Sequence, residues 1–145
     1  MKEIKANLWE YPADYRVITT NGFVKKGEGK AVMGRGCARE AAKKYPKVPK
    51  WLGIVLLNSG NHVHLFPYHI ITFPVKHNWW ETADPQLIKQ SVHELVNLVD
   101  LIGAESIVMP RPGCGNGGLN WEDVKPLLES HLDDRFTAVS FQEES

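Results

Sequence analysis

Cysteine is scarce in this chain of 145 residues, which contains only Cys37 and Cys114. Two cysteines are too few for a disulfide framework, and they lack the CxxC spacing of a redox or zinc motif. The chain also has no apolar run of the roughly 20 residues that a membrane-spanning helix needs. Residues 1–15 contain no apolar core of a signal peptide. These absences predict a reduced, cytoplasmic protein with no membrane partner.

An excess of charge is absent as well, because 17 lysine and arginine residues balance 17 aspartate and glutamate residues. No overall field attracts nucleic acid or a membrane surface. Because few phosphates can be neutralised, we expect no strong binding to unmodified DNA. Contact with one modified nucleotide is still compatible with this charge balance.

Familiar cofactor and metal motifs are missing too. The chain has no GxxxxGK[ST] loop, no spaced GxGxxG motif, and no HExxH or HxxxH pairing of its six histidines. His62 and His64 fall on one face of an expected strand, where packing or solvent contact explains them better than metal ligation does. We therefore expect neither a metal ion nor a cofactor.

The sequence does contain alternating strand and helix patterns, which predict a three-layer α/β fold in one domain. Predicted strands cover 15–23, ending in an Asn-Gly turn, then 106–110 and 136–141, the last as an edge or neighbouring strand. Residues 52–73 are predicted to form two or three strands, with a hairpin turn at 58–61. The first predicted helix begins after Gly36 and stops before Pro46. The second follows a cap at Thr82 or Asp84, has Pro85 in its first turn and ends at Gly103, and the third follows a cap at Asn120.

Two glycine-rich loops, Gly34–Gly36 and Gly113–Gly118, precede predicted helix N-termini. In α/β folds ligands bind where strands lead into helices, and the N–H groups of a helix N-terminus favour an anion. Glycine allows the backbone to approach a phosphate closely. This pattern favours phosphate binding, and the alternative is a tight turn that needs positive φ.

Three stretches resemble the macrodomain family, the ADP-ribose-binding module: TTNGFV, AVMGRGCAREAAKKYP and PRPGCGNGGLNWEDVKPLL. The similarity extends from about Asn7 to Phe141. A fourth stretch, ITFPVKHNWW, resembles a segment of macrodomains that remove ADP-ribose from DNA as antitoxins, and of the terminal ADP-ribose protein glycohydrolase of animals. The resemblance implies a single macrodomain over residues 1–145, with a mixed central sheet in a three-layer α/β/α fold.

The resemblance also implies roles for individual residues. Asn21 belongs beside the distal ribose, Lys76 falls on the catalytic lysine, and Phe141 matches the aromatic residue that stacks on adenine. The two phosphate loops are Gly34, Arg35 and Gly36, and then Gly113, Cys114, Gly115, Asn116, Gly117 and Gly118.

Two positions depart from the family pattern. Asn7 stands where an aspartate usually accepts a hydrogen bond from the adenine amino group, so adenine recognition loses charge assistance. Gly117 stands where the animal glycohydrolase has an aspartate that works with its lysine, as expected for the DNA-directed subgroup. The two-residue mechanism is therefore not expected here.

Two chemical roles remain open for Lys76, beside the alternative of a solvated surface lysine. As a neutral amine it can form a Schiff base with the opened sugar, which requires a pKa lowered by apolar neighbours such as Phe73 or Trp79. As an ammonium it can stabilise charge on the departing group. Trp79 and Trp80 either line the pocket, stack on an attached base or pack at its rim.

Other chemistry-bearing residues have plainer interpretations. His77 is interpreted as a loop residue rather than an acid–base partner, and Cys114 as a small structural residue rather than a nucleophile. Trp121 is expected to pack against the sheet. Arg35 either pairs with a phosphate or faces water.

Three functions fit these residues. The first is a hydrolase that releases ADP-ribose from a modified nucleic-acid base or protein side chain, with a separate ADP-ribosyltransferase toxin as its partner. The second is a phosphatase acting on ADP-ribose 1″-phosphate, for which Asn21 is the candidate residue. The third is a non-catalytic ADP-ribose-binding module.

Overall fold

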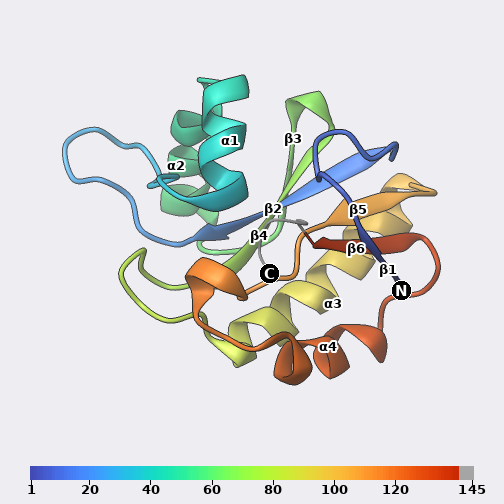
Figure 1. Ribbon diagram of the computed structural model, residues 1–145. Helices are drawn as coiled ribbons and strands as arrows, with labels where there is room; N and C mark the ends of the chain where they lie inside the picture. Colours follow the sequence, from blue (N-terminus) through green and yellow to red (C-terminus); the bar gives the residue numbers. More distant parts are fainter. Residues whose placement is uncertain (141–145) are drawn as a thin grey trace.

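A six-stranded sheet forms the centre of the protein (Figure 1). The computed structural model describes residues 1–140, so Phe141 lies outside the described residues. Along the sheet the order is β1-β6-β5-β2-β4-β3, and only the β3–β4 pair is antiparallel. The predicted mixed sheet is therefore confirmed. The strands are β1 (Lys2–Lys5), β2 (Tyr15–Asn21), β3 (His64–Phe66), β4 (Ile70–Lys76), β5 (Ile107–Met109) and β6 (Phe136–Ser140).

Helices cover both faces of the sheet, which confirms the three-layer prediction. On one face lie α1 (Gly36–Lys44) and α2 (Val48–Ser59), and on the other α3 (Pro85–Ile102) and α4 (Trp121–Glu129) (Figure 1). Alternate strand residues supply the two cores, since successive side chains of a strand point to opposite faces. Val17 packs into the core under α3 and α4, whereas Ile18 packs into the core under α1 and α2.

The prediction of strands from residue 52 onward was wrong for its first part. Residues Val48–Ser59 form helix α2, and the expected hairpin turn is the end of this helix, with Gly60 as its C-cap at φ 86°. A short apolar run such as LGIVLL suits a buried strand and a buried helix equally well. Its buried residues, Val48, Leu52 and Leu56, recur at helical spacing. The true β3–β4 connection is a 3₁₀ turn at Pro67–His69.

The sheet extends further at its N-terminal side than the sequence indicated. Strand β1 was not predicted, because Lys2–Lys5 contains one apolar residue among three charged ones. Charged residues are typical of an edge strand. Strand β1 pairs with β6, so β6 is an internal strand and the alternative of an edge position was wrong.

The helix boundaries agree better with the prediction. Asp84 caps α3 by accepting a hydrogen bond from the Gln86 N–H, and Gly103 ends it in the left-handed conformation. Asn120 occupies the N-cap position of α4 without a side-chain hydrogen bond. Within residues 1–140 no helix combines the length and the apolar character needed to cross a membrane.

Candidate functional site

A cavity of about 1260 Å³ opens where the parallel strands end and the two glycine loops begin. It is lined at the end of β2 by Asn21, at the end of β4 by Lys76, and after β5 by Pro110. The size suits a nucleotide-like ligand. Eleven sequence-predicted residues line this one cavity: Asn21, Gly34, Arg35, Gly36, Lys76, Gly113, Cys114, Gly115, Asn116, Gly117 and Gly118.

The first loop leads directly into α1. Gly36 begins the helix at φ 57°, and no side chain caps the N–H groups of the first turn. These N–H groups are available to an anion. A Cβ atom at Gly34 would meet no atom within 4 Å, and one at Gly36 would lie 3.4 Å from Nδ2 of Asn116. The two glycine loops therefore approach each other across the cavity.

The glycines of the second loop serve two different needs. A Cβ at Gly113 would lie 2.8 Å from Cδ1 of Ile88, and one at Gly118 would lie 3.3 Å from the Thr82 methyl group. Packing against α3 and the segment before it thus explains these two, and both also have positive φ. Gly115 differs, since its φ is 65° but a Cβ there would meet nothing within 4 Å. Gly115 is therefore the glycine of this loop with open space around it.

Lys76 connects the second loop to the segment after β4. Its Nζ donates hydrogen bonds to the carbonyl oxygens of Asn116, at 3.2 Å, and of Trp79, at 3.4 Å. Its register partner on β2 is Asn21. The amine is consequently held at the cavity wall by backbone acceptors.

Asn21 uses both atoms of its amide on the backbone. Nδ2 donates to the Val32 carbonyl and Oδ1 accepts from the Phe23 N–H, each at 3.0 Å. Gly22, the next residue, has no space for a side chain, because a Cβ there would lie 2.8 Å from Nδ2 of Asn61. Asn21 therefore fixes the chain around the cavity mouth.

Asn61 supports the site from behind and was not singled out by the sequence. Its Nδ2 donates to the Lys76 carbonyl at 3.0 Å, which secures the end of β4. The residue follows α2 by two positions, in a segment that was interpreted as a hairpin turn. No motif marked it, because its partner is 15 residues away in the chain.

His77 lies outside the cavity lining, in agreement with its interpretation as a loop residue. Its Nε2 is 2.7 Å from Oδ2 of Asp84, the cap of α3. The hydrogen bond from His77, helped by the Gln86 N–H, lowers the pKa of the Asp84 carboxyl. This contact fastens the 77–84 loop to the helix that follows.

Three aromatic residues, Phe23, Trp79 and Trp80, line the cavity and form what we call the aromatic rim. Trp80 contacts Trp79 and Phe23 edge to face, with ring centroids 5.5 and 5.3 Å apart. Trp79 is 49% exposed and Trp80 58% exposed. Much of this aromatic surface is open to a ligand.

Asn7 does not line the cavity, although its neighbours Ala6 and Leu8 do. Its Oδ1 accepts a hydrogen bond from the Trp9 N–H at 2.8 Å, which closes a local turn. The amide oxygen predicted to receive adenine is thus engaged by the chain itself.

Both cysteines line the cavity. Burial raises the pKa of the Cys37 thiol, whose Sγ lies 3.5 Å from the Thr19 hydroxyl. Sγ of Cys114 donates to the Pro112 carbonyl at 3.7 Å. Within residues 1–140 no three histidine, cysteine, aspartate or glutamate residues gather so that they could hold a metal ion.

Trp121 connects the second loop to the edge of the sheet. It packs partly buried against the core, and its indole N–H donates to Glu3 of β1 at 2.9 Å. Arg111 lies over the Trp121 ring, 5.0 Å from its centroid. The predicted packing of Trp121 is therefore accompanied by a hydrogen bond to the edge strand β1.

Comparison with known proteins agrees with this geometry. The family model described as "Macro domain" matches residues 30–128. The chain belongs to the macrodomain family. The DNA ADP-ribosyl glycohydrolase of Thermus aquaticus is 25% identical over 137 residues, which cover 92% of this macrodomain and 38% of the relative. The Mycobacterium tuberculosis enzyme of the same name is 29% identical over 110 residues, 68% of this chain and 31% of the relative. This macrodomain thus spans about a third of the length of these relatives.

Solved structures show the same fold. The macrodomain of Mycobacterium tuberculosis DarG superposes with a TM-score of 0.79 and 25% identity, over 97% of this chain and 98% of that one. Thermosipho africanus DarTG in complex with ADP-ribose gives a TM-score of 0.83 at 19% identity, over 99% of this macrodomain and 43% of that chain. This macrodomain is therefore related, at low identity, to DarG-type DNA ADP-ribosyl glycohydrolases.

Proposed function

We propose that this macrodomain binds ADP-ribose and hydrolytically releases it from a modified nucleic-acid base or protein side chain. The observation that carries the proposal is the position of Lys76, whose amine is held at the cavity wall between the second glycine loop and Trp79. The relatives named DNA ADP-ribosyl glycohydrolase support it. A binding module would not require a cation at this position.

The cavity suggests how the ligand lies. The pyrophosphate binds between Gly34–Gly36 and Gly113–Gly118, where the uncapped N-terminus of α1 supplies N–H donors. The distal ribose then lies toward Lys76 and Asn21. The adenine lies toward Ala6, Leu8 and Val139, an apolar part of the lining. Asn7 lies outside the cavity lining, so we expect adenine binding to depend mainly on these apolar residues.

Hydrolysis breaks the bond between C1″ of the distal ribose and the attached group. Positive charge develops on the sugar, and the leaving group takes the bonding electrons. An ammonium at Lys76 has three N–H groups, two of which meet the Asn116 and Trp79 carbonyls, and the third can stabilise the leaving group.

A neutral amine at Lys76 fits the same contacts in a different way. Its two N–H groups donate to the same carbonyls, and its lone pair attacks C1″ once the ribose ring has opened. The bond between C1″ and the attached group then breaks, and that group departs with a proton given up by the amine. The resulting Schiff base is then hydrolysed by water. Borohydride separates the two mechanisms, because only the Schiff base is reduced to a stable adduct on Lys76, which mass spectrometry detects.

The phosphatase alternative receives less support from the site. It relied on Asn21 near the distal ribose, but both atoms of that amide are engaged by backbone groups. Each atom retains one N–H or one lone pair for a ligand, but a neutral amide is not basic enough to activate a water molecule.

The proposal is tested with the wild-type protein by calorimetry with ADP-ribose, followed by incubation with an ADP-ribosylated thymidine oligonucleotide and an ADP-ribosylated peptide. We expect heat of binding and release of ADP-ribose from one of the two substrates. Absence of heat would contradict the proposal and return the glycine loops to a structural role. Binding without release, together with cleavage of ADP-ribose 1″-phosphate, would instead establish the phosphatase.

We further propose that an ADP-ribosyl transferase supplies the substrate. A relative from Thermosipho africanus, 32% identical over 76 residues, is named as a fusion of a DNA ADP-ribosyl transferase and a DNA ADP-ribosyl glycohydrolase. A transferase and a hydrolase of this kind perform opposite reactions on one substrate. Co-expression with such a transferase is expected to relieve its toxicity.

A further inference from the structure

Charge is distributed very unevenly along this chain. Residues 25–50 contain nine basic and two acidic residues, a net charge of +7, whereas the rest of the chain contains eight basic and fifteen acidic residues, a net charge of −7. The net charge of zero, from which weak attraction to nucleic acid was expected, is therefore the sum of a basic segment and an acidic remainder of the chain.

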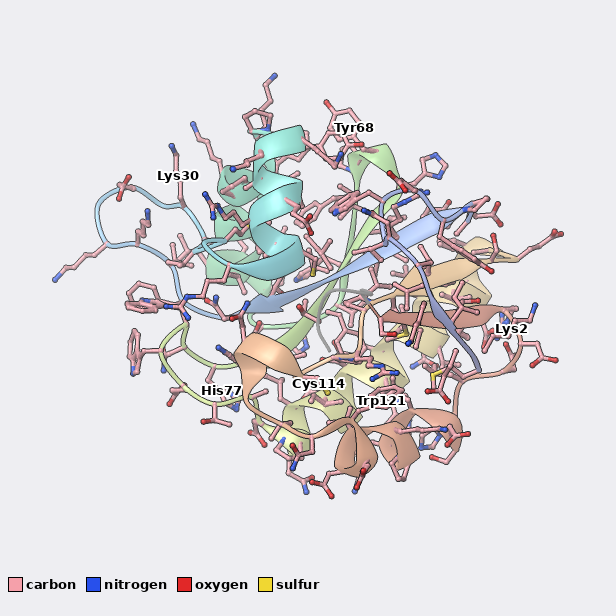
Figure 2. The ribbon with its side chains drawn as sticks, in the orientation of Figure 1. Lys2, Lys30, Tyr68, His77, Cys114 and Trp121 are labelled. Carbon is pink, nitrogen blue, oxygen red and sulfur yellow. The ribbon has the colours of Figure 1, made fainter. Side chains whose placement is uncertain are left out.

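The basic segment forms one continuous part of the molecule. It comprises helix α1, the start of α2 and the loop before Gly34, which lies against α2 (Figure 1). Lys30 and Lys2 lie on opposite sides of the molecule (Figure 2). We call the exposed basic side chains of this region the basic face; they are Lys25, Lys26, Lys30, Arg35, Arg39, Lys43, Lys44, Lys47 and Lys50.

The basic face is not neutralised by the protein itself. None of its nine side chains forms an ion pair with another described residue. Elsewhere in the described residues, by contrast, Lys125 forms an ion pair with Glu3, and Arg135 forms ion pairs with Asp100 and Asp133. The basic face thus has its charge available for an external anion.

The basic face continues to the mouth of the cavity. Lys25 and Arg35 belong to both, and the aromatic rim lines the same mouth. From Gly36 to Lys44 helix α1 extends about 12 Å away from the mouth. A helix face of this length can contact several consecutive phosphates of one strand.

We propose that the basic face and the aromatic rim together bind a single-stranded nucleic acid, with its phosphates along α1 and neighbouring bases stacked on Trp79 and Trp80. The inference rests on the proposed function, because it identifies the group that presents ADP-ribose to Lys76. Exposed aromatic rings beside unpaired cations are the combination that binds single strands. A duplex fits poorly, because its bases already stack on each other. An acidic peptide would contact the basic face but has no bases that could stack on the aromatic rim.

The test measures binding of a fluorescent, unmodified 12-nucleotide oligothymidine by anisotropy between roughly 20 and 200 mM salt. Three variants are compared with wild type: K43E/K47E on the basic face, Trp80→Ala on the rim, and K2E/K89E as the control. Both double variants change exposed lysines and lower the net charge equally. Circular dichroism verifies that each variant is folded.

We expect wild type to bind the oligonucleotide at low salt, with an affinity that falls steeply as salt rises. K43E/K47E loses about tenfold in affinity, and its salt slope becomes shallower by about 1.4, or 0.7 for each lost phosphate contact. Trp80→Ala also loses about tenfold, whereas K2E/K89E stays within about twofold of wild type.

Three results would overturn the inference. Equal losses in the two double variants would show that total charge alone governs binding. Duplex binding as tight as single-strand binding, with Trp80→Ala unchanged, would exclude the stacking role. Binding of oligoglutamate in place of oligothymidine would indicate an acidic protein partner.

Calorimetry with ADP-ribose separates this inference from the proposed function. If wild type does not bind ADP-ribose but the oligonucleotide affinities follow the expected pattern, the proposed function is disproved and the nucleic-acid-binding surface is supported. If ADP-ribose binds but K43E/K47E holds the oligonucleotide as wild type does, only the surface is disproved.

Discussion

At the scale of single residues, the glycines of the site divide by the space around them. The sequence marked the clustered glycines of both loops, but it could not separate those that pack from those that face open space. Gly113 is enclosed by Ile88, Leu119 and Ala83, whereas Gly34 has nothing near its missing side chain. That distinction depends on residues far apart in the chain, which is why only the fold revealed it.

Gly113→Ala and Gly34→Ala are expected to separate folding from binding. At Gly113 the positive φ and a 2.8 Å contact with Ile88 should cost about 2–3 kcal/mol of unfolding free energy. At Gly34 neither applies, so stability is retained while a close phosphate loses its room and ADP-ribose affinity falls. Urea unfolding and calorimetry measure the two effects. Equal stability of both variants would contradict this division.

At the scale of elements, the sequence predicted a helix or strand well where local signals agreed. Helix α3 has a capping aspartate, an early proline, regular apolar spacing and a terminal glycine, and its prediction was confirmed. Helix α2 lacks a capping side chain, and it exposes the apolar residues Ile54 and Leu57 to solvent. Because apolar residues lie on both its buried and its exposed face, the sequence showed no alternation at helical spacing. Tertiary contacts stabilise it as a helix: its buried residues pack into the core with Ile18 and Ile70, and Gly53 lies against the loop that contains Gly29.

Gly53→Ala tests the contact between α2 and the loop that contains Gly29. A Cβ at Gly53 would clash with the Gly29 carbonyl oxygen, so one of the two segments must move. We expect a loss of roughly 3 kcal/mol in unfolding free energy. The control, Leu57→Ala, changes a 68% exposed residue of the same helix and should stay within about 0.5 kcal/mol of wild type. Similar values for both would contradict the contact.

The cap of α3 should give the protein a component of acid sensitivity. Because the His77 contact lowers the pKa of Asp84 below that of an unfolded chain, its stabilisation is present above about pH 4. It is lost as the pH falls through the lowered value. Asp84→Ala should therefore be about 1 kcal/mol less stable than wild type at pH 7, with a difference that shrinks below about pH 4. Thermal unfolding across pH 2–7 measures this, and a constant difference would refute it.

At the scale of the whole molecule, the sequence predicted the three layers and the location of the cavity but not the arrangement of charge. The strand order and the glycine loops bring Asn21, Lys76 and Gly113–Gly118 to one end of the sheet. The net charge of the whole chain is zero, so it does not reveal that residues 25–50 are strongly basic and the remaining residues strongly acidic. Asn7 shows a related limit, since its position in the sequence did not reveal that it lies outside the cavity lining and accepts a hydrogen bond from the Trp9 N–H.

Ligand binding should stabilise the whole fold, because the cavity is lined by several strands and by both glycine loops. ADP-ribose at a hundred times its dissociation constant adds about 2.7 kcal/mol. For a domain of this size we expect Tm to rise by roughly 10 °C. Differential scanning fluorimetry measures the shift, with adenosine monophosphate as a smaller control ligand. An unchanged Tm at saturating ADP-ribose would contradict the assignment of the cavity.

One assay separates a chemical role of Lys76 from a role in binding alone. Release of ADP-ribose from an ADP-ribosylated thymidine oligonucleotide is timed for wild type and for Lys76→Ala, with ADP-ribose affinity measured for both. If Lys76 performs the chemistry of the cavity, wild type releases ADP-ribose, the variant does so at least about a hundredfold more slowly, and the affinity stays within about tenfold. Release by Lys76→Ala at the wild-type rate would contradict this chemical role.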